Sequence, residues 1–115
     1  MKRPSMKTPR NYVFIAAGLL ALAPLVAHGQ ERDPVKHGRQ LVGQFCARCH
    51  AVARFGRSPH RDAPPFRTLG RTIDLDGFAR ALSGGLEAEH PDMPGVKFSI
   101  DEARDVRAYL RSIQR

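Results

Sequence analysis

Apolar residues recur at helical spacing in three segments of the chain. The first segment begins at Asp33-Pro34. Asp33 suits a helix N-cap, and Pro34 suits the first helical position, where its missing N–H is not needed. It runs into Cys46. One face carries small and apolar residues: Val35, Gly38, Leu41, Val42 and Phe45. This spacing predicts a helix that is buried along that face.

Two more helices are predicted further along the chain. The second covers about residues 75–83 and ends at Gly84-Gly85. The third begins with a capping box, in which Ser99 caps the helix and Glu102 reaches back to it. Its buried stripe consists of Ile100, Ala103, Val106, Leu110 and Ile113. No segment alternates polar and apolar residues as a half-buried strand does, so we expect an all-α fold.

Irregular chain separates these helices. Residues 53–71 contain Pro59, Pro64 and Pro65, which the interior of a regular helix does not tolerate. Residues 86–98 form a second irregular segment. A structureless loop as long as the first is unusual in a small domain unless it wraps a bound group.

The first 29 residues have the pattern of a secretory signal peptide. A basic start precedes an apolar run from Tyr12 to Ala27, and the small residues Ala27 and Gly29 precede the expected cleavage point after Gly29. The alternative is an uncleaved membrane anchor. It is disfavoured because the run is shorter than the roughly 20 residues that span a bilayer. We expect a cleaved signal over 1–29 and one domain over 30–115, exported to the periplasm without a stable membrane span.

Charge changes once this signal is set aside. The chain has nineteen Lys and Arg against eleven Asp and Glu, a formal net charge of +8. Four of the basic residues and none of the acids lie within 1–29, so fifteen cations and eleven acids leave about +4 on the remaining domain. Such a modest charge lacks the concentrated basic stripe of a nucleic-acid-binding surface, and we expect no nucleic-acid partner.

The segment Cys46-Ala47-Arg48-Cys49-His50 is C-x-x-C-H, the pattern of covalent haem attachment. Two thiols at this spacing can form thioethers with the two vinyl groups of one haem. His50 then lies under the iron as an axial ligand, with its second ring nitrogen held by a hydrogen-bond acceptor. We therefore expect one covalently attached haem c, containing iron.

Three other uses of the cysteines fit the sequence less well. A thioredoxin-like redox pair would need a βαβ context, which is missing from the pattern. A structural zinc site would need a second closely spaced ligand pair, whereas His37, His60 and His90 are scattered. A disulfide is compatible with export, but one that closes so short a loop gives little entropic stabilisation.

Met93 is the candidate for the sixth ligand of the iron. It is the only methionine within 30–115 and lies between prolines, in Pro91-Asp92-Met93-Pro94. Methionine and histidine together raise the potential of a haem above that of two nitrogen ligands. The main rival is His90 and a weaker one is His60, while filling of the core is the ordinary alternative for a methionine.

With these motifs the chain resembles a small class I c-type cytochrome over nearly all of the expected domain. Gly38 lies eight residues before Cys46, where the family has a small residue at the crossing of its first and last helices. Residues 105–110 resemble the terminal helix, with Val106 and Tyr109 facing the first. Val42 replaces the aromatic residue common in the family. The resemblance implies three main helices and irregular loops around one haem.

Two loop roles also follow from the resemblance. Residues 90–94 resemble the methionine-ligand loop of small bacterial members. Residues 63–66 resemble the loop whose proline carbonyl accepts the proton of the ligating histidine, and Pro64 is the candidate for that carbonyl, with Pro65 as the alternative.

An iron with both axial positions filled cannot bind a substrate, which restricts its chemistry to moving one electron. We therefore expect an electron carrier between exported redox partners, and no enzyme activity. A run of arginines would favour partners that are acidic at the docking site: Arg48, Arg54, Arg57, Arg61, Arg67 and Arg71. The alternatives are an electron-transfer subunit of a larger oxidoreductase, or an open-site sensor or peroxidase-like protein if Met93 does not ligate.

Overall fold

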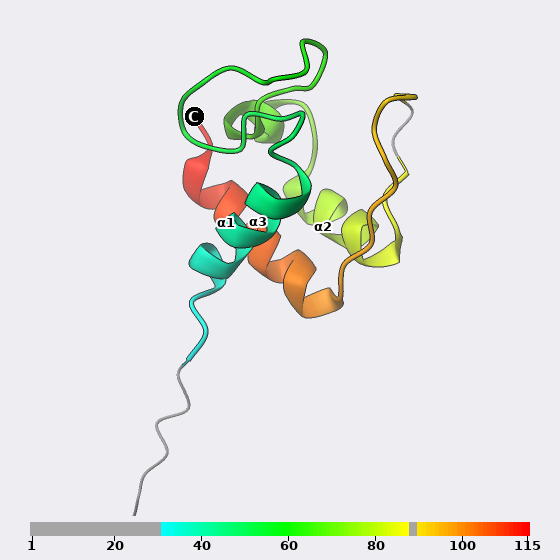
Figure 1. The fold of residues 1–115 in the computed structure, drawn as a ribbon. Helices are drawn as coiled ribbons and strands as arrows, with labels where there is room; N and C mark the ends of the chain where they lie inside the picture. Colours follow the sequence, from blue (N-terminus) through cyan, green and yellow to red (C-terminus); the bar gives the residue numbers. More distant parts are fainter. Residues whose placement is uncertain (1–30, 88–89) are drawn as a thin grey trace, which may run out of the picture.

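The computed structural model describes residues 31–87 and 90–115 of the chain. These residues contain four helical elements joined by loops. In these residues, strand-like pairing is limited to one isolated antiparallel bridge between Leu86 and Val96. The all-α prediction is therefore confirmed. The elements are α1 (Pro34–Phe45), the 3-10 helix η1 (Phe66–Arg71), α2 (Leu75–Gly84) and α3 (Ile100–Ile113) (Figure 1).

The expected signal peptide, residues 1–29, lies outside the described residues. Its cleavage, and the start of the domain at residue 30, therefore stay predictions. None of the helices in the described ranges is long and apolar enough to cross a membrane.

The helix ends follow the capping signals in the sequence. The Asp33 carboxylate accepts the backbone N–H groups of Val35 and Lys36, at 2.9 and 3.2 Å. Asp74 caps α2 in the same way, accepting from Asp76 and Gly77. At α3 both hydrogen bonds of the capping box between Ser99 and Glu102 are formed. Each cap satisfies N–H groups that a helix start leaves without partners.

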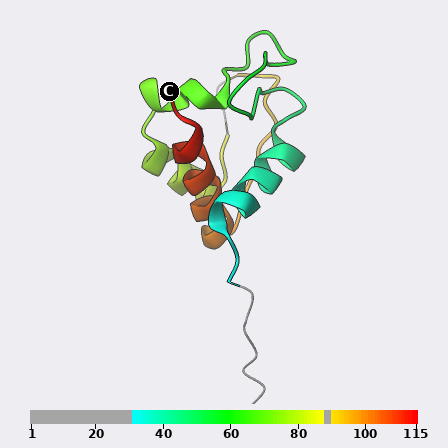
Figure 2. The ribbon, with the colours of Figure 1, turned by 90° about the vertical axis from the view of Figure 1, so that its left-hand side faces the viewer.

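α1 crosses α3 at Gly38, and both views of the ribbon show the two helices side by side (Figures 1 and 2). A Cβ atom at Gly38 would overlap the backbone carbonyl of Asp105 and approach the Tyr109 Cβ to 2.9 Å. Only glycine allows this approach, and the resemblance implied a small residue at this crossing. The most deeply buried side chains, Val42, Val106 and Leu110, belong to these two helices.

Asp105 is the buried charged residue of this crossing, at 6 % exposure. Its carboxylate lies 2.7 Å from the His37 Nδ1 and 3.0 Å from the Arg32 guanidinium. Both partners precede or belong to α1, so one carboxylate ties the start of the domain to its last helix. A buried carboxylate needs such partners, because its desolvation is costly when it stays unpaired.

The expectation of irregular chain throughout 53–71 is wrong at its end, because η1 covers Phe66–Arg71. Phe66 and Leu69 are three residues apart and therefore fall on one face of a 3-10 helix, where both are buried. The Gln114 amide secures η1 to the end of α3. It donates to the Phe66 carbonyl at 2.8 Å and accepts from the Gly70 N–H at 2.7 Å.

Candidate functional site

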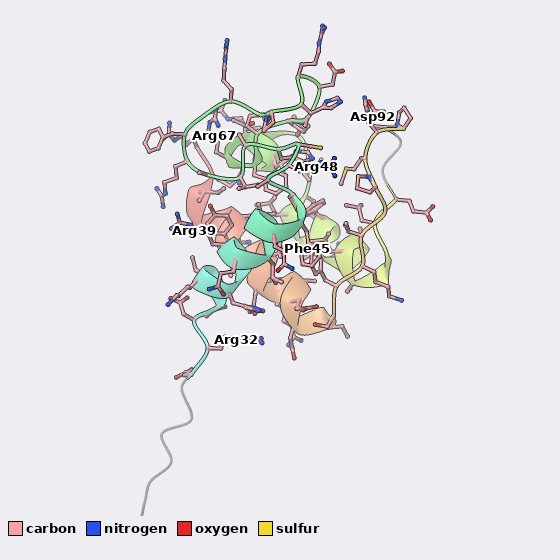
Figure 3. All side chains as sticks on the ribbon, viewed as in Figure 1. Arg32, Arg39, Phe45, Arg48, Arg67 and Asp92 are labelled. Carbon is pink, nitrogen blue, oxygen red and sulfur yellow. The ribbon has the colours of Figure 1, made fainter. Side chains whose placement is uncertain are left out.

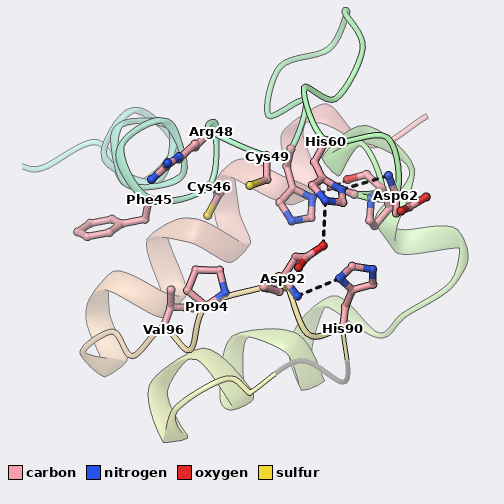
Figure 4. Close-up of a pocket in the computed structure, with 14 residues that line it drawn as sticks. Phe45, Cys46, Arg48, Cys49, His60, Asp62, His90, Asp92, Pro94 and Val96 are labelled. Carbon is pink, nitrogen blue, oxygen red and sulfur yellow. Dashed lines mark hydrogen bonds and ion pairs between the residues drawn. The ribbon is translucent and has the colours of Figure 1, made fainter.

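A cleft opens between the turn that follows α1 and the segment before α3 (Figure 4). Its walls come from parts of the chain that are far apart in sequence, the C-x-x-C-H turn with the loop after it and residues 90–96. All of the predicted site residues line it: Cys46, Cys49, His50, Pro64 and Met93. The structure thus brings together in one cleft every residue that the motifs singled out.

The end of α1 shapes the cysteine side of the cleft. The backbone N–H groups of Cys49 and His50 both donate to the Cys46 carbonyl, at 3.2 and 2.9 Å. This tight turn presents both sulfur atoms to the cleft, as Figure 4 shows. Both cysteines are free thiols, so no disulfide joins them. Burial raises the pKa of the Cys46 thiol to about 11, which keeps it neutral at physiological pH.

His50 is held by the loop that follows the motif. Its Nδ1 lies 2.8 Å from the Pro64 carbonyl oxygen. A carbonyl can only accept, so the proton is on Nδ1 and the lone pair is on Nε2. The Phe66 ring packs against the imidazole, with the ring centroids 4.8 Å apart. The contacts fix both the tautomer and the ring orientation that a metal-binding histidine requires.

The segment that carries Met93 forms the opposite wall. Asp92, Pro94 and Val96 from this segment face the cysteines across the cleft in Figure 4. Met93 is half-buried, and its backbone N–H donates to the His90 carbonyl at 3.1 Å. Below it, Leu86 and Val96 exchange two backbone hydrogen bonds, of 2.8 and 3.1 Å, which close the base of the segment.

The two rival histidines line the same cleft, and both contact Asp92. The His60 Nε2 lies 3.3 Å from the Asp92 carboxylate, and the His90 Nδ1 accepts the Asp92 backbone N–H at 3.3 Å. Their rings meet edge to face, with centroids 5.8 Å apart. Both histidines therefore already bond to Asp92 at the mouth of the cleft.

Three of the six arginines that were expected to favour acidic partners make hydrogen bonds elsewhere in the fold. Arg54 donates to the Ser112 carbonyl, Arg67 to the Gly56 carbonyl and Arg71 to the Arg115 carbonyl. Figure 3 shows Arg67 on the opposite side of the molecule from Asp92. Of the six arginines, Arg48 lines the cleft, together with the acids Asp62 and Asp92.

Apolar side chains complete the lining of the cleft. Phe45, which directly precedes Cys46, lines it and stays 49 % exposed, with its ring edge to face with Phe98 at 5.3 Å. Pro94 and Val96 line the facing wall.

These residues fit a covalently held haem. The cleft offers two free thiols, an imidazole with one nitrogen already fixed, a thioether and an apolar lining. The described ranges contain no group of three or more His, Cys, Asp and Glu that could hold a metal ion.

Comparison with known proteins bears independently on which family the chain belongs to. No protein-family model matches the chain, and no solved structure matches it. A curated relative is the cytochrome c-552 of Bradyrhizobium diazoefficiens strain USDA 110. It is 35% identical over 78 residues, which cover 68% of this chain and 73% of that protein.

Proposed function

The chain belongs to the class I c-type cytochromes, and on that premise we propose that His50 and Met93 are the two axial ligands of its haem iron. Like its family, it carries one covalently bound haem c and is an electron carrier rather than an enzyme. The haem, when bound, supplies an iron that takes up and releases one electron. The observation that carries the ligand assignment is the cleft itself, which His50 and Met93 line together.

Cys46 and Cys49 hold the group covalently in this proposal. Their two thiols would hold a haem through thioether bonds to its vinyl groups, each S–H adding across one C=C bond with no atom lost. The turn at the end of α1 supports this role, because it presents both sulfurs to the cleft. A thioether has no acidic proton, which suits a buried position such as that of Cys46.

The His50 imidazole binds through Nε2, since its Nδ1 donates to the Pro64 carbonyl. That hydrogen bond raises the basicity of the ligand and fixes the ring. Met93 supplies a sulfur from the opposite wall. With both positions filled, the protein's own part in electron transfer is to hold the ligands still and to keep water out with Phe45, Pro94 and Val96.

Absorption spectra of both redox states test the ligand pair. The oxidised protein should show the far-red sulfur-to-iron band, and Met93→Ala should lose it while the haem stays attached on a denaturing gel. The matched control is His90→Ala, which should keep the band. A band that survives in Met93→Ala and disappears in His90→Ala would transfer the ligand role to His90.

The partners in this proposal are exported redox proteins, met in the periplasm, that are acidic where they dock. Arg48 supports this, because it is exposed and lines the cleft. Arg57 and Arg61 are also exposed on the adjoining loop, although Arg61 lies 3.6 Å from the Asp62 carboxylate. The cation count at the cleft is therefore small, and Arg48 is the residue on which steering should depend most.

Small redox reagents of opposite charge test this steering. Arg48→Gln should slow electron exchange with an anionic metal complex and speed it with a cationic one, and added salt should shrink both effects. Arg104→Gln, on the exposed side of α3, is the control that should change neither rate. Equal behaviour of the two variants would remove Arg48 from the docking surface.

A further inference from the structure

His60 and Asp92 meet across the mouth of the cleft, although 32 residues separate them in the sequence. Figure 4 shows the contact as a dashed line that joins the two walls. The His60 Nδ1 accepts the Asp62 backbone N–H at 3.3 Å, so the ring proton is on Nε2. The Nε2–H then donates to the Asp92 carboxylate, 3.3 Å away. A neutral imidazole suffices for this hydrogen bond.

Each partner is tied to one side of the site. The His60 backbone N–H donates to the Cys49 carbonyl at 3.1 Å, which anchors His60 to the attachment motif. Asp92 directly precedes Met93. The contact therefore links the wall that holds the cysteines and His50 to the wall that holds Met93.

We infer that His60 and Asp92 form a clamp, meaning this one side-chain hydrogen bond, that positions the Met93 loop, residues 90–94, against the opposite wall. The inference rests on the proposed role of Met93 as an axial ligand. His60 and Asp92 are positioning residues, because they act on the iron only through Met93.

The clamp complements the contact at the base of the same segment. Leu86 and Val96 pair through two backbone hydrogen bonds and hold the segment where it leaves the fold. Between that base and its tip, the Met93 loop contains two prolines and no regular structure. A restraint at the tip is what prevents such a loop from swinging outward about its base, and Asp92 provides it.

The clamp also explains why His60 is not available to replace Met93. Its Nδ1 and Nε2 are both engaged, one with the Asp62 N–H and the other with Asp92. Opening the Met93 loop breaks this contact and frees Nε2. The same hydrogen bond therefore positions the Met93 loop and keeps the His60 Nε2–H engaged.

Displacement of Met93 by an external ligand tests the clamp. Imidazole added to the oxidised holoprotein can bind the iron only after Met93 leaves, and loss of the far-red band follows that step. His60→Ala and Asp92→Ala should each accelerate it about two- to fivefold, the range for an exposed ion pair or hydrogen bond. Asp92→Asn keeps an acceptor oxygen and should stay near the wild-type rate.

The double variant and a neighbouring substitution complete the design. His60→Ala with Asp92→Ala should be no faster than either single variant, because both remove one contact. Arg61→Ala, at a side chain 92% exposed beside His60, should leave the rate unchanged.

The failures are distinguishable. Wild-type protein without the far-red band would overturn the ligation by Met93, and the clamp with it. A normal band with unchanged rates in both alanine variants, or with effects that multiply in the double variant, would overturn the clamp alone.

Discussion

Gly38 of α1 and Asp105 of α3 approach so closely that a side chain at position 38 would overlap the Asp105 carbonyl. The two residues define how near the first and last helices come to each other. Because Cys46 directly follows α1, this packing also positions the start of the attachment motif relative to α3.

Replacing Gly38 with Ala should destabilise the protein by about 1–3 kcal/mol, because the added methyl group forces the helices apart. Gly43 is the matched control, since it lies in the same helix with nothing within 4 Å of an added Cβ. Gly43→Ala should be stabilising by roughly 0.5–1 kcal/mol, the helix preference for Ala over Gly. Urea unfolding of both variants measures these changes in the free energy of unfolding. Equal changes in the two variants would contradict the close approach.

Asp105→Ala should cost about 1–3 kcal/mol, because the hydrogen bonds that the buried, charged carboxylate accepts from His37 and Arg32 are lost. Asp101→Ala is the comparison on the same helix. Its side chain is 70% exposed and, among the described residues, bonds Arg104 only, so its removal should cost under about 0.5 kcal/mol. Thermal or urea unfolding checks the pair; a small loss at Asp105 would mean that its hydrogen bonds contribute little.

The capping box predicts a dependence of stability on pH. The Ser99 backbone N–H, and then its hydroxyl, hold the pKa of Glu102 below its ordinary range. A lowered folded-state pKa stabilises the fold above the unfolded value of about 4.3, and this contribution is lost as the pH falls through the folded value. Glu102→Gln cannot titrate. The stability difference between wild type and Glu102→Gln should therefore be constant from about pH 6 to 8 and shift below about pH 4. A difference that does not change with pH would contradict this origin.

Met93→His offers a test of how the axial ligand sets the potential. A second nitrogen ligand lowers the reduction potential relative to methionine. The variant should therefore keep its covalent haem, lose the far-red band and become harder to reduce in a potentiometric titration. An unchanged potential would show that the sixth position in the wild type is not held by sulfur.

Local signals allowed the helices to be predicted well, because a cap acts within about one turn of the residue that makes it. Asp33 and Ser99 each accept the N–H groups that their positions predicted. The helix η1 was missed because it contains a single pair of buried apolar residues, Phe66 and Leu69, beside prolines. One such pair gives no repeating period to read.

Contacts between distant segments could not be read from spacing. Arg54 and Arg71 belong to the run of arginines that was expected to favour acidic partners. They instead donate to the Ser112 and Arg115 carbonyls at the C-terminal end of α3. The end of a helix leaves carbonyls without partners, and long guanidinium groups can reach them from another loop. The meeting of His60 with Asp92 depends on tertiary structure in the same way.

The acceptor for His50 is a main-chain oxygen, that of Pro64. No side-chain substitution at position 64 deletes that oxygen, so most point mutations there leave the acceptor in place. What can disturb it is the route of the loop, which Pro64 and Pro65 stiffen by restricting their backbone torsions. Insertions or deletions between His50 and Phe66 should therefore harm the orientation of the imidazole more than replacements of single residues do.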